Sequence, residues 1–199
     1  MTEQPEAMET IIARCLKGDQ SGYALLYEQC APVIYRLCYG LLMNRQDAED
    51  VMQEAFVYAF KNLRRYDGSR ASFKTWLYTI ALSRCRNMYR RKHLPWMDLS
   101  CLLPLDLPAP KSEAPEVKLA QHDVKAAVEK ALAALTPNLR EAIVLRYGHG
   151  LTYREMAEVI GCPQKTAESR VRLAHERLRG VLQPVGQSLL DELIGIELG

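Results

Sequence analysis

Apolar residues recur at intervals of three and four along most of the chain, whereas the alternation typical of a half-buried strand nowhere extends over a useful length. The spacing predicts an early pair of helices, a long helix from Asp47, and another from about Ser72 to Lys92, with a break at Asp67-Gly68-Ser69. The sequence therefore predicts an all-α protein. The apolar positions that carry this prediction are Leu25, Leu26, Ile34, Leu37, Cys38, Leu41, Ala48, Val51, Met52, Ala55, Phe56, Ala59, Trp76, Leu77, Ile80, Ala81 and Cys85.

A cluster of prolines interrupts this pattern and predicts a proline-rich linker over residues 94–116. The linker divides the chain into one small helical domain over residues 1–93 and a second over residues 117–180. Its apolar part, LPWMDLSCLLPLDLP, is expected to dock on another surface. Residues 181–199 form a short acidic and apolar tail, for which an amphipathic helix and a frayed end are equally expected.

The second domain carries the pattern of a helix-turn-helix between Leu132 and Leu178. Thr152 is suited to cap a short helix, Gly161 to make the turn and Pro163 to open the second helix. Small and apolar residues on that second helix predict one packed face, which leaves the other for the major groove of DNA. A helical hairpin with a solvated charged face is the alternative. The packed residues are Ala167, Val171, Ala174 and Leu178, and the outward ones are Gln164, Lys165, Glu168 and Arg172.

Charge is segregated along the chain although the net charge is only +2. Residues 61–93 hold ten Lys and Arg against one Asp, whereas residues 1–60 hold four against nine Asp and Glu. Residues 125–180 hold ten against six. This distribution predicts two surfaces that bind a polyanion, on a protein whose acidic helices meet a basic or polar partner.

Cysteine and histidine usage predicts neither a disulfide framework nor a metal or cofactor site. The six cysteines form no CxxC pair and the four histidines lie far apart. The acidic N-terminus lacks the apolar core of a signal peptide, and no stretch approaches the roughly eighteen apolar residues of a membrane span. We therefore expect a cytoplasmic protein without membrane insertion.

Three carboxylates, those of Asp47, Asp50 and Glu54, fall at positions i, i+3 and i+7 of the long helix and so share one face. Such a face suits either the divalent metal of a nuclease or the docking of a basic partner helix. A solvated acidic face is the commonest outcome for carboxylates alone. No further cluster of Asp, Glu or His lies nearby in the sequence, which weighs against the nuclease.

The segment RRYDGSRASFKTWLYTIALSRCRNMYRRK, from Arg64 to Lys92, interleaves aromatic and basic residues. Cationic side chains neutralise phosphates, and aromatic faces beside a Gly-Ser loop stack or pocket an unpaired base. We expect Phe73 and Trp76 to belong partly to the core. Phosphate contacts are assigned mainly to Arg84, Arg86, Arg90, Arg91 and Lys92.

Taken in order, these motifs resemble those of the extracytoplasmic-function sigma factors, the two-domain specificity subunits of bacterial RNA polymerase. DAEDVMQEAFVYAF is similar to the helix with which the family binds the polymerase clamp, and YDGSRASFKTWLYTIALSRCRNMYRR to its promoter-melting segment. LTPNLREAIVLRYGHGLTYREMAEVIGCPQKTAESRVRLAHERLR resembles its promoter-reading domain. The resemblance implies that residues 1–93 are a sigma region 2 domain and residues 117–180 a sigma region 4 domain.

The resemblance further implies that the chain is not an enzyme and has no catalytic residue, because core polymerase supplies the catalysis. Its partners would be promoter DNA, core polymerase and, as for many relatives, an anti-sigma factor. Core polymerase would be bound at the clamp coiled coil of its largest subunit and at its flap. The clamp-binding residues would be Asp47, Glu49, Asp50, Gln53 and Glu54, and the flap-binding residues Leu132, Leu135 and Leu139.

Two DNA-binding sets follow from the same resemblance. A loop and the helix after it would capture a base flipped from the minus-10 element, so that binding of the base offsets its unstacking. The helix-turn-helix would read the minus-35 element. The minus-10 set is Tyr66, Asp67, Gly68, Ser69, Arg70, Ala71, Ser72, Lys74, Arg84, Asn87, Arg90 and Arg91, and the minus-35 set is Thr152, Tyr153, Arg154, Gln164, Lys165, Thr166, Glu168, Ser169, Arg172 and His175.

Glu168 departs from the family pattern P-x-G-T-V-K/R-S-R, because a carboxylate stands where relatives commonly carry a base-reading cation. A carboxylate accepts a hydrogen bond from cytosine N4 and repels phosphate, which predicts a shifted minus-35 preference. Two other functions stay open from sequence. One is an autonomous helix-turn-helix regulator that binds promoter duplex without polymerase, and the other is a magnesium-dependent nuclease that requires Asp50.

Overall fold

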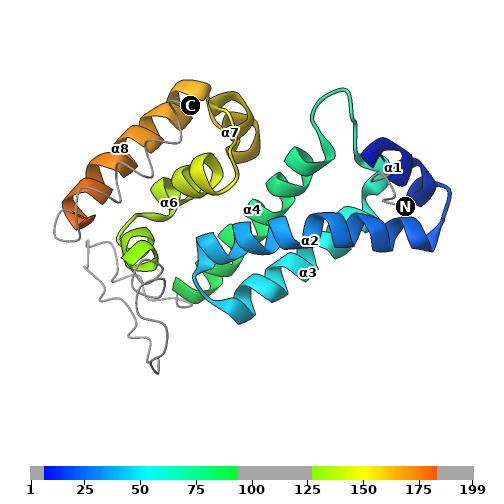
Figure 1. Cartoon of the computed structure of the whole chain (residues 1–199), viewed down its shortest axis with the longest axis horizontal. Coiled ribbons are helices and arrows are strands. Elements are labelled where there is room, and N and C mark those ends of the chain that lie inside the picture. The colour runs from blue at the N-terminus through cyan, green and yellow to red at the C-terminus, as the bar shows by residue number, and fades with distance from the viewer. Residues whose placement is uncertain (1–6, 94–126, 183–199) are drawn as a thin grey trace, which may run out of the picture.

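The computed structural model describes residues 7–93 and 127–182, and within these ranges the chain is helical and contains no strand (Figure 1). The all-α prediction is therefore confirmed for the described residues. The predicted linker over residues 94–116 and all but the first two residues of the tail lie outside them. The elements are α1 (Met8–Leu16), α2 (Gln20–Leu42), α3 (Arg45–Lys61), η1 (Leu63–Arg65), α4 (Phe73–His93), α6 (Pro137–Ile143), η2 (Val144–Gly148), α7 (Tyr153–Ile160) and α8 (Gln164–Leu182), with a further helical stretch over residues 127–133.

Helices α2, α3 and α4 run side by side and α1 packs on α2, forming what we call the N-terminal unit (Figure 1). Their inward faces carry the periodic apolar residues of the sequence. Leu26, Leu37, Val51 and Leu77 are fully buried. At about 25 cal/mol per Å² of buried apolar surface, this shared core is the main source of stability for the unit.

Helix α2 is one continuous helix and not the pair expected from the sequence. Pro32 lies in its middle and lacks the N–H that would bond to the carbonyl of Glu28. The Pro32 ring is exposed, so water can bond to that carbonyl. The buried residues of α2 continue beyond the proline with Ile34 and Leu37. The helix ends at Leu42, and the capping residue Met43 has a left-handed φ of 54° and donates its N–H to the Tyr39 carbonyl at 2.8 Å.

Helix α3 begins two residues earlier than the sequence predicts, because Asn44 caps it. The side-chain oxygen of Asn44 accepts a hydrogen bond from the Asp47 N–H at 3.0 Å. The seven buried residues of α3 include Asp47 itself, which therefore does not point into solvent.

The C-terminal unit, residues 127–182, contains the predicted helix-turn-helix. Thr152 caps α7 through a capping box with Glu155, and Gly161 makes the turn in a left-handed conformation with φ of 76°. Helix α8 follows Pro163 and runs to Leu182, slightly beyond the predicted end near Gly180. Its packed face is the predicted one, because Ala167, Val171, Ala174 and Leu178 are at most 7% exposed.

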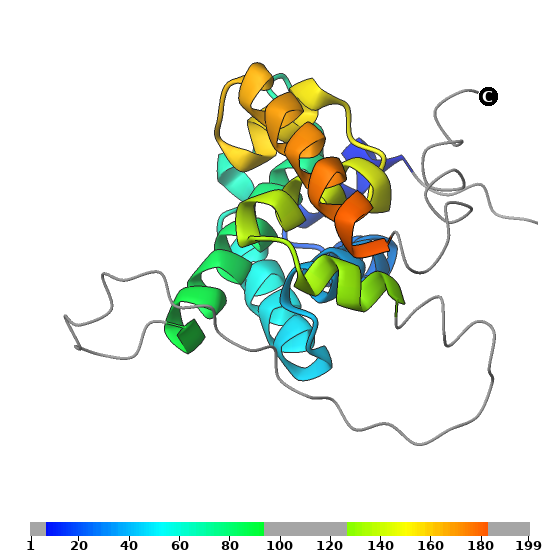
Figure 2. The same ribbon diagram turned by 90° about the vertical axis from the view of Figure 1, so that its left-hand side faces the viewer.

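The two units pack directly on each other (Figure 2). Helix α4 lies against α7, and α2 lies against α6 and the wider π-helical turn η2. The units approach closely at Gly40 of α2, where a β-carbon would lie 3.1 and 3.2 Å from the two methyl groups of Val144. Apolar residues of both units consequently form one continuous buried cluster.

Candidate nucleic-acid interface

The outward side of α3 carries an acidic and polar surface. Glu49, Asp50, Gln53 and Glu54 are all exposed, and the Gln46 side chain donates to the Asp50 carboxylate at 3.2 Å. Val57, one turn further along, is 52% exposed and places an apolar group beside these carboxylates. A charged rim next to an apolar contact suits docking of a protein partner with basic side chains.

Asp47 does not belong to this exposed surface, which corrects the prediction that three carboxylates share it. Its two carboxylate oxygens accept hydrogen bonds from the Lys92 ammonium at 2.7 and 2.6 Å. The reason is that the first turn of α3 faces the C-terminal end of α4. Asp47 therefore joins two helices of the N-terminal unit, and Lys92 is already engaged and not left for phosphate.

The loop before α4 is held in shape by its own hydrogen bonds. The Tyr66 hydroxyl donates to the Ala71 carbonyl at 3.1 Å, and the Tyr66 ring lies 5.5 Å from the rings of both Phe73 and Trp76. Asp67 accepts hydrogen bonds from the Ser69 N–H and hydroxyl at 3.0 and 2.7 Å, which lowers the pKa of its carboxyl. These contacts leave residues 67–70 exposed at the tip of a preformed loop.

The cations along α4 are unequal in their availability. Arg90 and Arg91 are exposed, and Arg90 donates to the Asn87 side-chain oxygen. The Arg84 guanidinium lies 4.9 Å from the ring centre of Tyr58 on α3, a cation–π contact that fixes its direction. These three arginines and Asn87 lie on one helix, as the sequence predicts for a surface that follows a DNA backbone.

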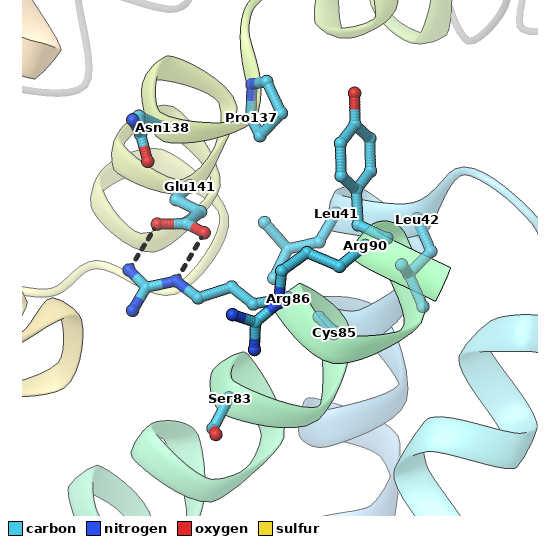
Figure 3. Close-up of a pocket in the computed structure, with 10 residues that line it drawn as sticks. Leu41, Leu42, Ser83, Cys85, Arg86, Arg90, Pro137, Asn138 and Glu141 are labelled. Atoms are coloured by element: carbon cyan, nitrogen blue, oxygen red, sulfur yellow. Dashed lines mark hydrogen bonds and ion pairs between the residues drawn. The ribbon is translucent and has the colours of Figure 1, made fainter. Parts of the chain in front are cut away.

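Arg86 is the exception and corrects the assignment of this residue to phosphate contact. Its Nε and Nη2 atoms donate to the two carboxylate oxygens of Glu141 at 2.8 and 2.7 Å (Figure 3). Its Nη1 atom donates to the Ile160 carbonyl at 3.3 Å. Glu141 is only 5% exposed. The pair raises the pKa of Arg86 and joins α4 to α6 and to the end of α7.

The outward face of α8 carries Gln164, Lys165, Ser169 and Arg172, all exposed. Gln164 donates to the Glu168 carboxylate at 2.9 Å, which orients both side chains on the same turn of the helix. Arg172 pairs with Glu176 at 2.6 Å. This face is the one predicted to enter a major groove.

Other members of the predicted minus-35 set have structural partners as well. The Thr152 side chain is used in the cap of α7, and Arg154 lies 3.6 Å from Glu158 on the same helix. The Tyr153 ring lies 4.9 Å from the guanidinium of Arg146, and the half-buried His175 ring lies 5.3 Å from that of Tyr147. Thr166 is half-buried.

The leucines assigned to the polymerase flap are packed inside the C-terminal unit. Leu135 is 3% exposed and belongs to a small buried cluster with Ile143 and Leu178, so its side chain is not accessible to a partner in this conformation. Leu132 and Leu139 are half-buried against the same cluster. Amphipathic spacing identifies leucines that are buried but does not show whether their own domain or a partner buries them.

The interdomain contact is the feature that sequence reasoning missed. Beside the Arg86–Glu141 pair, the Tyr78 hydroxyl and His149 Nδ1 share a hydrogen bond at 3.0 Å, and Arg140 donates to the Leu41 carbonyl at 3.0 Å. A cavity of about 420 Å³ opens next to it, lined by the ends of α2 and α4 and the start of α6 (Figure 3). A single carboxylate, Glu141, within an apolar stretch was the one sequence signal of a buried ion pair.

We expect stability to fall on acidification because of His149. Burial is the largest cause that lowers the pKa of His149 from 6.5 to about 4, and the nearby positive charges of Arg36 and Lys74 lower it further. As the pH falls, the His149 imidazole is therefore protonated in the unfolded chain before it is protonated in the folded protein. The stability that neutral, buried His149 contributes is complete above pH 6.5 and is lost as the pH falls toward 4. Between pH 7.5 and 5 the loss is about 2 kcal/mol in the free energy of unfolding.

Urea unfolding at the two pH values measures this loss. The matched variant His149→Gln keeps a polar side chain but does not titrate, and its pH dependence is expected to be smaller by about the same 2 kcal/mol. Carboxylates with lowered pKa values, such as Asp19 and Asp67, contribute equally to both proteins. Identical pH dependence in the two proteins would contradict the assignment to His149.

Within residues 7–93 and 127–182, no group of three or more His, Cys, Asp or Glu is placed to hold a metal ion. No helix in these same ranges is long and apolar enough to cross a membrane.

Comparison with known proteins matches both units to one family. The model of sigma-70 region 2 matches residues 26–94 and that of sigma-70 region 4 matches residues 125–178. The chain is 31% identical over 186 residues to the RNA polymerase sigma-H factor of Pseudomonas aeruginosa, covering 90% of this chain and 96% of that one. It is 30% identical over 187 residues to the ECF RNA polymerase sigma-E factor of Escherichia coli K12, covering 89% and 95%.

The fold is also similar to that of a solved structure, the sigma factor RpoE in complex with the anti-sigma factor NepR from Bartonella quintana. The TM-score is 0.61 with 23% sequence identity, over 81% of this chain and 96% of that one. At 23% sequence identity, this similarity supports a shared fold and nothing further.

Proposed function

Because this chain belongs to the extracytoplasmic-function sigma factors of the sigma-70 family, which direct promoter-specific initiation by RNA polymerase, we propose which of its surfaces perform each step. Sigma factors are not catalysts, and the chemistry belongs to the polymerase. The observation that supports the assignment best is the exposed acidic face of α3, carried directly beside the cationic helix α4. We therefore assign α3 to binding of the polymerase and α4 to binding of DNA.

Polymerase binding is assigned to the exposed side of α3. Glu49, Asp50, Gln53 and Glu54 would accept hydrogen bonds and ion pairs from a basic helical partner, the clamp coiled coil of the largest subunit. Val57 would supply apolar contact at the centre of the same face, since it is 52% exposed next to the carboxylates. Asp47 is omitted from this set because Lys92 already satisfies its carboxylate.

Promoter melting is assigned to the loop at residues 66–72 and to α4. The loop is preformed by the Tyr66 and Asp67 hydrogen bonds, so little conformational entropy is lost when it receives a flipped base. Arg84, Asn87, Arg90 and Arg91 would hold the adjoining phosphates. Their positions along a single helix suit a strand that runs beside it.

Reading of the minus-35 element is assigned to α8, whose exposed face would lie in the major groove. Lys165 is exposed for contact with phosphate or guanine, whereas Arg172 would have to exchange its ion pair with Glu176 for such a contact. The Gln164 and Glu168 side chains are held together by a hydrogen bond of 2.9 Å. An amide and a carboxylate on one turn suit adenine and cytosine, respectively.

Replacing Glu168 with Lys is expected to change the base preference at one minus-35 position. The carboxylate accepts from cytosine N4, whereas Lys donates to guanine O6 and N7, and each such contact discriminates by about 1–3 kcal/mol. Selection from randomised promoters with wild type and Glu168→Lys measures the shift. Glu28→Lys, the same charge change on the exposed side of α2 and outside the C-terminal unit, is the control, and one motif from both wild type and Glu168→Lys would show that Glu168 reads no base.

The proposal is tested by run-off transcription from randomised promoters with purified bacterial core polymerase. We expect specific start sites that appear only when the protein is added. If the protein instead binds promoter duplex tightly by itself and adds no start sites, the chain is an autonomous helix-turn-helix regulator.

We also propose that this chain acts in the cytoplasm, where its relatives work with RNA polymerase, and that an anti-sigma factor controls it. The similar RpoE fold was solved with such a partner, which supports the second statement. Co-purification of a protein that blocks core binding would test it.

A further inference from the structure

We propose that Tyr58 of α3 is a positioning residue for promoter binding, because its ring orients the guanidinium of Arg84 on α4 without neutralising it. The inference rests on the proposed function, in which Arg84 contacts a phosphate beside the minus-10 element. Tyr58 itself would touch no DNA, and its effect would pass through Arg84. Tyr58 belongs to none of the binding sets that the sequence predicts.

The two side chains meet where α3 packs against α4. The Arg84 guanidinium carbon lies 4.9 Å from the centre of the Tyr58 ring, within the range of about 6 Å over which a cation and an aromatic face attract each other. Tyr58 is 40% exposed and Arg84 is half-buried, so the pair lies at the surface of the N-terminal unit. Among residues 7–93 and 127–182, no ion pair involves the Arg84 side chain, and the ring is the contact that orients it.

Two other cations of α4 are oriented by carboxylates instead. Arg86 is paired with Glu141 at 2.7 Å, and Lys92 with Asp47 at 2.6 Å. A carboxylate fixes a cation but also cancels its charge and accepts its N–H groups. An aromatic ring carries no net charge and offers no oxygen acceptor, so Arg84 is oriented while its charge and its N–H donors stay available for phosphate.

Orienting Arg84 in advance should raise its affinity for a phosphate. An arginine side chain loses rotamer freedom when it binds, and the loss is smaller for a side chain that is already restrained in the unbound protein. Removing the ring of Tyr58 should therefore weaken the contact between Arg84 and DNA, although Arg84 itself is unchanged.

The place of Tyr58 on α3 also links this contact to the polymerase. Tyr58 directly follows Val57 and lies one helical turn beyond Glu54, and both of these residues are exposed on the face assigned to the polymerase clamp. A cation–π contact becomes stronger when water is excluded from it. Because docking of the polymerase on α3 would cover the pair, the holoenzyme should hold Arg84 more firmly than the free chain does.

Two substitutions of Tyr58 test the role of the ring. Tyr58→Leu removes the aromatic face, whereas Tyr58→Phe keeps it. Each protein is assembled with purified core polymerase and titrated with a promoter fragment that is selected with wild type and unpaired at the minus-10 element. We expect Tyr58→Leu to bind this fragment about three- to tenfold more weakly than wild type, and Tyr58→Phe to stay within about twofold.

The salt dependence of binding is the readout that a merely structural role would leave unchanged. On a single strand, each phosphate that a side chain neutralises contributes about 0.7 to the slope of log affinity against log salt concentration. Arg84→Gln should lower the magnitude of the slope by about this amount, and Tyr58→Leu should lower it toward the same value. The double variant should bind as Arg84→Gln does, because Tyr58 acts only through Arg84.

Tyr27→Leu is the matched control, since Tyr27 is a tyrosine of α2 with a similar exposure of 37%, and it should stay within about twofold of wild type. Wild-type affinity and slope in Tyr58→Leu would overturn the proposal, and so would losses that add in the double variant. Core affinity is measured in parallel without DNA, and a loss in Tyr58→Leu that weaker core binding explains would make Tyr58 a polymerase contact instead.

Failure of the proposed function gives a different result. If Arg84→Gln binds the promoter fragment as wild type does, Arg84 is not a DNA contact and both assignments are wrong. If Arg84→Gln loses affinity and slope but Tyr58→Leu does not, the DNA-binding role of Arg84 stands and only the role of Tyr58 is overturned.

Discussion

Reversing the charge of Asp50 and Glu54 together, as Asp50→Lys with Glu54→Lys, is expected to lower promoter-specific initiation at limiting protein by at least 100-fold. Both carboxylates are exposed on α3 and have no cationic partner among the ion pairs of the described residues, so they are available to a basic surface. Like charges across an interface cost several kcal/mol, and 100-fold corresponds to about 2.7 kcal/mol.

The measurement is binding to fluorescently labelled core polymerase, followed by run-off transcription. Exposed reversals of this kind usually change the free energy of unfolding by about 0.5 kcal/mol or less, so loss of folding is not expected to explain the effect. Glu28→Lys, an exposed reversal on α2, is the control and should stay within twofold of wild type. A doubly reversed protein that still binds core polymerase normally would move the docking surface elsewhere.

Replacing Tyr66 with Ala is expected to slow opening of duplex promoter by about tenfold to 100-fold. Tyr66 supports the loop from within, through its ring against Phe73 and Trp76 and its hydroxyl on the Ala71 carbonyl. Without it, the loop loses the shape that receives a flipped base, and base–aromatic contacts are worth about 1–3 kcal/mol each. Burial of the ring also raises the pKa of its hydroxyl, so Tyr66 acts as a neutral donor.

The comparison variant is Tyr66→Phe, which keeps the ring packing and removes one hydrogen bond worth about 1 kcal/mol. We expect it to retain most of the opening rate. Both proteins should be compared on duplex promoter and on a promoter already unpaired at the minus-10 element. A defect of equal size on the two templates would show that Tyr66 does not act in melting.

The helix-turn-helix was predictable because every signal for it is local. The Thr152 cap, the Gly161 turn and the spacing of the packed residues on α8 each depend on neighbours within four positions. The continuity of α2 through Pro32 was not predictable from local signals, because tertiary packing along the rest of the helix outweighs the destabilisation by one proline.

The ion pairs were beyond sequence reasoning for a different reason. Asp47 meets Lys92 across 45 positions, and Arg86 meets Glu141 across 55. Periodicity shows which way a side chain points from its helix but not which charge on another helix it meets. From the sequence, Arg86 and Lys92 were therefore both assigned to phosphate contact, because they lie in a segment rich in basic residues.

The close approach of Gly40 to Val144 also limits how freely the halves of related factors can be exchanged. A hybrid that joins residues 1–93 of this chain to the promoter-reading half of a relative would need a residue no larger than valine opposite Gly40 and a carboxylate opposite Arg86. Hybrids that meet only the promoter-reading requirements would have the intended sequence preference, but their two units would not pack on each other as they do in this chain. Matching these two positions is therefore a design rule for hybrid factors that keep the contact between their two units.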